Sequence, residues 1–417
     1  MRKKITYTGA VFALLVSANA TAAETMDAER WSIEKIVTRA SEKTPEINAL
    51  YKDIESAENL ARQAGKWDNP DLGLSAGPMS QGGMNGRAVD VSIKQSVPLF
   101  GQKAIAEKIG EQKKTSVELA SKKQILFLKS EVIRLAIRLA TLDEQAKHTL
   151  HRKEKINLVA NFLGTRPFAS PAQATEKTLI LNRLREIEEK FVEISTAREN
   201  AWKALNVFLN LEREIVPDAK WTTAPTLPDR EKLLASFEEQ NPDLQSQKSL
   251  IAKASLEAEQ AAKKRFPDIR LGAGYNEQTA DLPQRTYTGT IEFSLPIVDR
   301  GDYGKRAALA EKEAATYRLE QKRRELLSQF EQSWTVLIQS KKRIALYPLS
   351  LVSSLETQMD RTEQSWKKGL VPVTSYLELE NQVHEQAFKV FEAQSGYMEA
   401  LTQLKLLSGV DSGLEEK

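Results

Sequence analysis

One helical stretch, residues 102–163, is too long for a compact globular domain. Within it, apolar side chains recur at alternating spacings of three and four residues: Ile125, Leu128, Val132, Leu135, Leu139, Leu142 and Ala146. This is the a/d spacing of a helix that packs along one seam against a partner helix. A helix of about 62 residues is ~90 Å long at 1.5 Å per residue. The sequence therefore predicts a coiled coil, a fibre or a tube.

The chain also contains an internal repeat. Four short motifs recur in the same order and at a nearly constant separation. The pairs are Thr44–Ile47 with Asn241–Leu244, Asn69–Leu72 with Phe266–Ile269, Val97–Leu99 with Leu295–Ile297, and Gly164 and Pro167 with Gly369 and Pro372. We interpret the mature chain as two structural repeats, residues 28–225 and 226–417.

Each repeat is expected to contain the same elements in the same order. These are a helix (42–66; 239–264), a β-hairpin (70–97; 267–296), a very long helix (102–163; 303–367), a turn with glycine and proline, and a return helix (171–209; 375–408). Pro45 and Pro242 stand near the starts of the first helices, where a missing N–H group costs little. Coiled-coil helices are thus predicted over 102–209 and 303–408, and the fold class is mainly α with two β-hairpins.

The hairpins have one apolar and one polar face. In the first, Val89, Val91, Ile93 and Val97 alternate with polar residues, and in the second, Tyr287, Gly289, Ile291, Phe293 and Leu295 do. The partner strands are expected at 72–77 and 269–275. A lone hairpin is marginally stable in water. We expect the hairpins to pair with partner chains, because closure into a barrel removes exposed strand edges.

The N-terminus has the pattern of a secretory signal peptide. Arg2, Lys3 and Lys4 precede an apolar run, and small residues follow up to Ala23. Residues 1–23 are therefore assigned to the signal, with cleavage after Ala20, Ala22 or Ala23. Its removal takes three positive charges from a formal net charge of +3. The remaining balance near zero gives no reason to expect a nucleic-acid partner.

The composition excludes several kinds of site. The chain has no cysteine and three histidines, so thiolate chemistry is excluded and a histidine-rich metal cage is not expected. His148 and His151 have the spacing of a metal-binding pair, but neighbouring basic residues favour two exposed helix histidines. There is no glycine-rich phosphate loop and no hydrolase motif. We expect neither an enzyme nor a cofactor.

After the signal, no apolar run approaches the roughly 18 residues of a membrane-spanning helix. A membrane β-barrel remains compatible with the sequence, because its strands carry only a weak alternating signal. Five aromatic residues lie at or beside the ends of the predicted strands: Trp67, Phe100, Phe266, Tyr275 and Tyr287. They suit the rim of such a barrel, although ordinary packing explains them nearly as well.

The strand-to-helix junction carries a family resemblance. Gln95-Ser96-Val97-Pro98-Leu99-Phe100-Gly101-Gln102-Lys103, together with Asn69-Pro70-Asp71, resembles the TolC-like outer-membrane efflux factors and is closest to their cobalt–zinc–cadmium resistance branch. The resemblance implies a homotrimer in the outer membrane, in which four strands per chain form a twelve-stranded barrel. The barrel would continue as an α-helical tunnel into the periplasm.

The resemblance also implies partners and a substrate. The partners are a periplasmic adaptor protein and an inner-membrane pump of the RND type, together with outer-membrane lipid. The chain itself is then a passive exit duct, and heavy-metal cations are the implied substrate. Two alternatives remain: a duct for type I protein secretion, and a periplasmic coiled-coil scaffold.

Two turns are placed by the resemblance at the periplasmic tips, where they contact the adaptor. They are Gly164-Thr165-Arg166-Pro167 and Gly369-Leu370-Val371-Pro372. Each glycine is predicted to end its helix in the left-handed conformation. Ser170, and Thr374 with Ser375, are predicted to cap the return helices.

The tunnel aperture is expected just beyond the second tip. The resemblance assigns it to Trp366, Ser375 and Glu378. A family aspartate is replaced by Ser375, and the tip arginine of some members is replaced by Val371. A ring of three Glu378 side chains would attract cations, although a solvated helix face explains Glu378 equally well.

Overall fold

The computed structural model describes residues 29–81, 84–164, 170–219, 226–263, 266, 269–279, 282–293, 295, 297–298 and 300–410. The predicted signal peptide, residues 1–23, lies outside this range. Two compact units are formed. Unit 1 comprises the chain up to Ile47, Leu126–Ala235 and the chain from Gln329, and unit 2 comprises Asn48–Ile125 and Ser236–Ser328. Each unit therefore combines segments from both predicted repeats.

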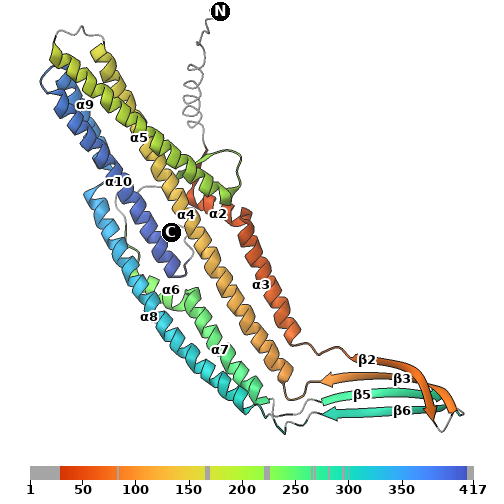
Figure 1. The fold of residues 1–417 in the computed structure, drawn as a ribbon. Coiled ribbons are helices and arrows are strands. Elements are labelled where there is room, and N and C mark those ends of the chain that lie inside the picture. Colours follow the sequence, from red (N-terminus) through yellow and green to blue (C-terminus); the bar gives the residue numbers. More distant parts are fainter. Residues whose placement is uncertain are drawn as a thin grey trace, which may run out of the picture. The chain divides into compact units, whose positions relative to one another are not determined.

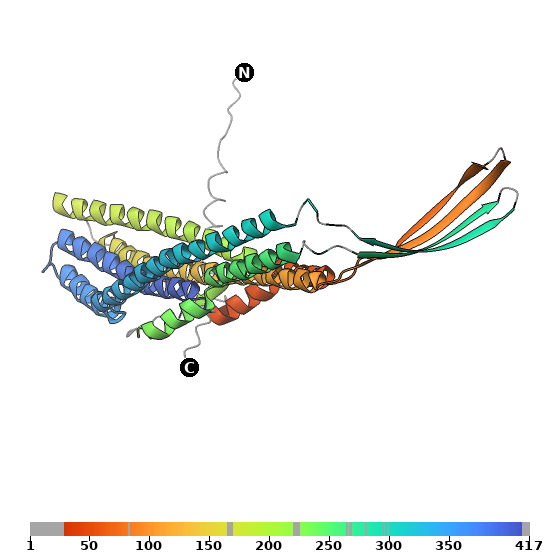
Figure 2. The same ribbon diagram turned by 90° about the horizontal axis from the view of Figure 1, so that it is seen from below.

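Unit 2 contains a single four-stranded antiparallel sheet. The order is β2-β3-β5-β6, with bounds Asp71–Gln81, Met84–Val97, Ile269–Thr279 and Gln284–Phe293. Figures 1 and 2 show the four strands running side by side. The two hairpins are joined through β3 and β5, so strands far apart in the sequence share one sheet.

The strand register separates the side chains into two faces. Leu72 lies opposite Ile93, and Leu271 lies opposite Ile291 on the same apolar face. The opposite face is polar and rich in hydroxyl groups and glycine. It contains Ser75 opposite Asp90, with Ser92, Gly274 and Thr288 in one row. The predicted alternation is confirmed, because successive residues of a strand point to opposite faces.

Helices α3 (Pro45–Ala64) and α7 (Pro242–Lys263) precede the two hairpins. Both prolines occupy the first helical position, as predicted. Helix α4 (Gln102–Gly164) begins in this unit and packs closely on α3. A Cβ atom on Gly110 would lie 2.9 Å from the Cα of Ala61, so glycine allows this approach.

Unit 1 is a bundle of helices. Its elements are α2 (Ile33–Lys43), the second part of α4, α5 (Pro171–Leu209), the start of α6 (Arg230–Gln240), the end of α8 (Asp302–Leu346), α9 (Ser350–Lys367) and α10 (Val373–Leu407). A short parallel pair, β1 (Glu29–Ser32) with β4 (Ile215–Asp218), lies beside α2. The sequence analysis did not predict this pair, α2 or α6.

Heptad packing holds unit 1 together. The buried residues Ile180, Ile187, Ile194 and Ala201 of α5 recur every seven positions, as in a coiled-coil seam. One apolar cluster joins α2, α4, α5 and the strand pair, including Ile36, Leu139 and Leu205. Leu128, Val132 and Leu135 of the predicted seam are also buried.

Three predicted helices differ from the structure at prolines. The helix expected over 42–66 is divided at Thr44, and the one over 239–264 at Asn241, because a residue before proline disfavours the helical conformation. The helix expected over 303–367 is divided at Pro348, which lacks the N–H group that a continuous helix requires. No helix in the described part of the chain is apolar and long enough to span a membrane.

Candidate functional site

The turn between α9 and α10 is fixed by backbone hydrogen bonds. Gly369 has φ 74°, and its N–H donates to the carbonyl of Trp366 over 2.8 Å. The N–H of Leu370 donates to the carbonyl of Ser365 over 3.0 Å. This pair of bonds is a Schellman motif, which satisfies carbonyls that a helix end leaves free. The predicted left-handed stop at Gly369 is confirmed.

The first tip differs from the prediction. Gly164 is the last residue of α4 and does not have positive φ, so the predicted left-handed stop there is wrong. Thr165, Arg166 and Pro167 lie outside the described residues. Helix α5 then begins at Pro171, and Ser170 accepts a hydrogen bond from the N–H of Gln173, as predicted.

The predicted caps of α10 are wrong. Thr374 and Ser375 lie inside the helix, whose N-cap is Pro372 without a side-chain hydrogen bond. Pro372 has φ −63°, close to the helical value, so the helix can begin directly after it. Within this turn Leu370 is 74% exposed. Val371, where some relatives of the resembled family have arginine, packs instead against an apolar cluster beneath the turn.

That cluster contains Trp366. Its ring stacks on Tyr376 with centroids 5.5 Å apart and meets Phe162 edge-on at 6.0 Å. Only 6% of Trp366 is exposed. Trp366 therefore lies in the core of the single chain, and its place at the aperture stays a prediction. Its large apolar surface is more stable in the core, where it supports the turn.

Ser375 and Glu378 lie together on the outer side of α10. Both are exposed and line an open hollow with Thr374, Leu379 and Gln382. The Glu378 carboxylate accepts a hydrogen bond from Gln382 Nε2 over 2.9 Å. The structure thus brings two of the three predicted aperture residues together and separates the third.

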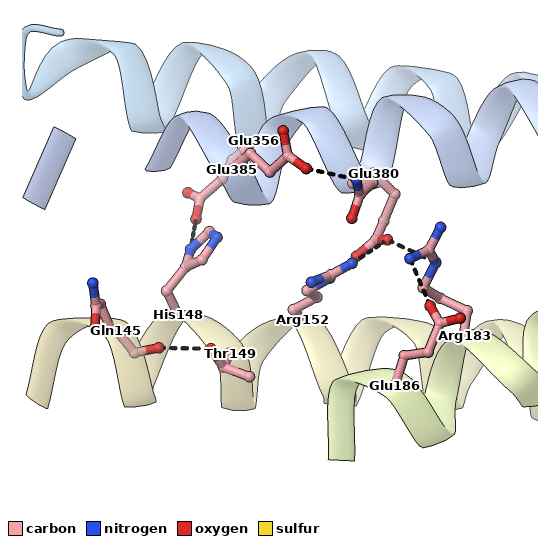
Figure 3. Close-up of polar contacts among 10 residues, drawn as sticks. Gln145, His148, Thr149, Arg152, Arg183, Glu186, Glu356, Glu380 and Glu385 are labelled. Atoms are coloured by element: carbon pink, nitrogen blue, oxygen red, sulfur yellow. Dashed lines mark hydrogen bonds and ion pairs between the residues drawn. The ribbon is translucent and has the colours of Figure 1, made fainter. Parts of the chain in front are cut away.

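Sequence reasoning missed the most buried charged residue of this region. Glu380 is 5% exposed and lies on the inner side of α10. Arg152 of α4 donates to it through both Nε and Nη2, the latter over 2.7 Å. Arg183 of α5 approaches the same carboxylate at 3.7 Å and also binds Glu186, as Figure 3 shows. Glu380 therefore links α10 to two other helices.

A histidine pair lies one turn further along. His148 stacks on His384 with centroids 5.4 Å apart. His148 Nδ1 lies 3.8 Å from the Glu356 carboxylate (Figure 3). Burial, together with Arg152, lowers the pKa of His148 to about 4 and that of His384 to about 3. Both rings are therefore neutral at neutral pH.

The expectation of two exposed histidines holds for His151 and is wrong for His148. The reason is that α10 covers this face of α4, which the sequence of α4 alone does not show. A small cavity of about 40 Å³ lies beside the pair. Among the described residues, no group of three or more His, Asp and Glu side chains is arranged to hold a metal ion.

The spacing of residues along α10 could have indicated that Glu380 is buried. Buried residues recur at alternating spacings of three and four: Val373, Tyr376, Glu380, Val383, Ala387 and Val390. Glu380 occupies a position that is normally apolar. A carboxylate at such a position indicates a buried charge that requires a partner.

Comparison with known proteins identifies the fold. The sequence profile described as "Outer membrane efflux protein" matches residues 233–410. No protein with a curated description matches the chain significantly. The open state of the MtrE outer membrane channel of Neisseria gonorrhoeae superimposes with a TM-score of 0.77 at 14% identity, covering 92% of this chain and 90% of that one.

Two further channels have similar values. One is CusC, whose structures concern folding and transmembrane channel formation. It superimposes with a TM-score of 0.73 at 14% identity, and the match covers 91% of this chain and 92% of CusC. The CmeC outer membrane channel of Campylobacter jejuni has a TM-score of 0.71 at 14% identity, covering 92% and 87%. The chain has the fold of these outer membrane channels.

The match to the outer membrane efflux protein family covers part of the site. Residues 233–410 include the α9–α10 turn, Ser375, Glu378 and Glu380. Helix α4, with Arg152 and His148, lies outside the matched range. The buried contacts of Glu380 and His384 therefore connect the matched half of the chain to the other half.

Proposed function

We propose that this chain is the outer-membrane channel of a tripartite efflux system. It acts as a passive exit duct, extends into the periplasm and receives substrate from an inner-membrane pump and a periplasmic adaptor. The observation that carries the proposal is the sheet of unit 2. Its apolar face is solvent-exposed in the single chain, with Leu74 at 70% and Ile291 at 67% exposure.

An exposed apolar sheet face must be shielded from water by lipid or by another protein surface. The outer strands β2 and β6 each pair with one neighbour in the described sheet, so each has a free edge. Free edges invite pairing with another chain. Three chains, each with four strands, would close a twelve-stranded barrel whose apolar face contacts lipid. The polar face, with Asp90, Ser92 and Thr288, would then line the lumen.

The helical tips suit the adaptor contact. The proposed contact residues are Gly164, Thr165, Arg166 and Pro167 at one tip, and Gly369, Leu370, Val371 and Pro372 at the other. Leu370 supports the proposal most directly, because an exposed leucine on a rigid turn is a ready apolar anchor. The stacked Trp366 and Tyr376 beneath it hold that turn in place.

The proposed aperture residues are Trp366, Ser375 and Glu378, of which Trp366 lies in the core of the single chain. Both outer residues face an open hollow on α10. In a trimer, three Glu378 carboxylates around one axis would raise the local concentration of cations. This supports cations as the substrate. Heavy-metal cations in particular, and an RND-type pump as the partner, are proposed from the family resemblance alone.

Cell fractionation tests the proposal. We expect the chain in the outer-membrane fraction and as a trimer in mild detergent. A soluble monomer released by osmotic shock would instead identify a periplasmic scaffold.

Deleting the gene tests the substrate separately. Loss of tolerance to zinc, cobalt, cadmium or copper salts supports metal efflux. Unchanged metal tolerance, with loss of a secreted protein from the medium, supports type I secretion.

A further inference from the structure

Two of the three histidines in the chain face each other between α4 and α10. The rings of His148 and His384 are nearly parallel, with an angle of 8° between their planes. Phe388 packs against both rings, and Phe391 meets His148 edge-on at 6.3 Å. The pair is thus part of the apolar contact between two helices. Burying the two imidazoles in this contact costs little free energy only when both are uncharged.

Groups of both charge signs, together with the titratable His151, surround the pair. They are His151, Arg152 and Lys155 on α4, Arg183 and Lys190 on α5, Glu356 and Asp360 on α9, and Glu380 on α10. Asp360 binds Lys155 over 2.6 Å, and Glu380 binds Arg152. The acid that remains beside the pair is Glu356, which is itself partly exposed and so gives little stabilisation to a protonated His148.

The cavity beside the pair gives a proton access to it. His148 and His384 both line this space of about 40 Å³, together with Tyr376 and Glu380. A space of this size holds a water molecule. His384 Nδ1 and Tyr376 Oη are buried and have no hydrogen-bond partner among the described residues. His384 Nδ1 is therefore not held by a structural hydrogen bond.

We propose that the His148–His384 pair is a proton-binding site whose protonation releases α10 from α4. When neutral, the stacked rings contribute apolar contact between the helices. When protonated, two cations lie 5.4 Å apart in the apolar contact between the helices, close to the guanidinium of Arg152. Helix α10 also carries Ser375 and Glu378 near its start, so its release would alter the aperture. That last consequence rests on the proposed function, whereas the helix separation does not.

The size of the effect follows from proton linkage. In the packed state the pKa values are about 4 for His148 and about 3 for His384, against 6.5 when the rings are free. The separated state binds more protons between these values, so the packed state loses stability as the pH falls below 6.5. Relative to pH 7.5, linkage favours separation about 15-fold at pH 6 and roughly 800-fold at pH 5.

Hydrogen exchange of the full chain in detergent measures this directly. A helix that loses its packing unfolds readily in water, because most of its stability comes from tertiary contacts. Amide protection in α10 therefore reports the equilibrium between packed and separated helix, whether or not the separated state is abundant. After correction for the intrinsic rate, protection of residues 376–391 should fall roughly 800-fold between pH 7.5 and 5. Protection of α5 over 187–205 should change far less. Unchanged protection of α10 would overturn the proposal.

Variants assign the effect to the pair. His148→Gln with His384→Gln should remove the pH dependence, because glutamine does not titrate in this range. His151→Gln, an exposed histidine on the same helix, should retain it. Should the double variant fail to fold, His384→Gln alone should reduce the change to roughly 30-fold. If amide protection in the double variant, or in His384→Gln alone, still fell with pH as much as in the unaltered protein, other groups would cause the effect. That result would contradict the proposal.

Discussion

At the scale of residues, the buried pair of Arg152 and Glu380 is the most constrained feature of unit 1. Replacing Glu380 with Met leaves Arg152 buried without its partner. Breaking a buried ion pair costs about 3–5 kcal/mol. We therefore expect Glu380→Met to lower the free energy of unfolding by about 3 kcal/mol, measured by circular dichroism of the purified protein in denaturant.

Glu378 provides the matched control on the same helix. It is exposed, so Glu378→Met should change the free energy of unfolding by less than about 0.5 kcal/mol. Removing both charges, Arg152→Met with Glu380→Met, should restore most of the loss, because two apolar residues tolerate burial. Equal destabilisation by the Glu378 and Glu380 variants would show that Glu380 is solvated in the native protein.

Of these two glutamates, one was predicted from the sequence and the other was not. Resemblance indicated Glu378, and the structure places it on an open surface with Ser375. Glu380 was missed even though it interrupts an apolar seam. Its partner lies 228 positions away, and the heptad pattern of one helix does not reveal which residue of another helix faces it. His148 was misjudged for the same reason.

At the scale of elements, the two tip glycines should respond in opposite directions to alanine. Gly369 is in the left-handed region, where a Cβ atom costs about 1–2 kcal/mol. Gly164 is helical, and no atom lies within 4 Å of the position of an added Cβ. Gly369→Ala should therefore destabilise the α9–α10 turn by about 1 kcal/mol, whereas Gly164→Ala should stabilise α4 by about 0.5 kcal/mol.

Thermal unfolding of the two variants provides the measurement. Each melting temperature is compared with that of the unaltered protein under the same detergent conditions. A decrease for Gly164→Ala would indicate a left-handed glycine at the end of α4, as the sequence analysis first predicted.

Element types were more predictable than element ends. The seam in α4 and the alternation in β3 and β6 follow from periods of 3.5 and 2, which are local properties of the chain. The breaks at Thr44, Asn241 and Pro348 were missed, although proline supplies a local signal at each.

At the scale of the whole molecule, the sequence and the spatial units divide the chain differently. The order of helix, hairpin, long helix and return helix occurs twice. Yet unit 2 takes one hairpin from each half of the chain, and unit 1 takes helices from both. The pairing of β3 with β5 explains this, because it joins the two hairpins into one sheet. A repeat along the sequence shows which elements match but not which elements touch.

Under the proposed function, assembly in the membrane should depend on which face of the sheet carries a charge. Leu74 lies on the apolar face opposite Val91, and Ser75, the next residue, lies on the polar face opposite Asp90. An arginine on a lipid-facing side costs about 2–4 kcal/mol at the membrane midplane. We expect Leu74→Arg to reduce the outer-membrane fraction and the amount of trimer on mild-detergent gels.

Ser75→Arg is the matched control, since it adds the same charge one residue away. Asp90 across the strand would pair with the new guanidinium, so this variant should assemble as the unaltered chain does. Because three copies would each carry the substitution, the difference between the variants should be large. Equal loss from both variants would mean that neither face meets lipid, and the apolar face would then have to be covered by protein.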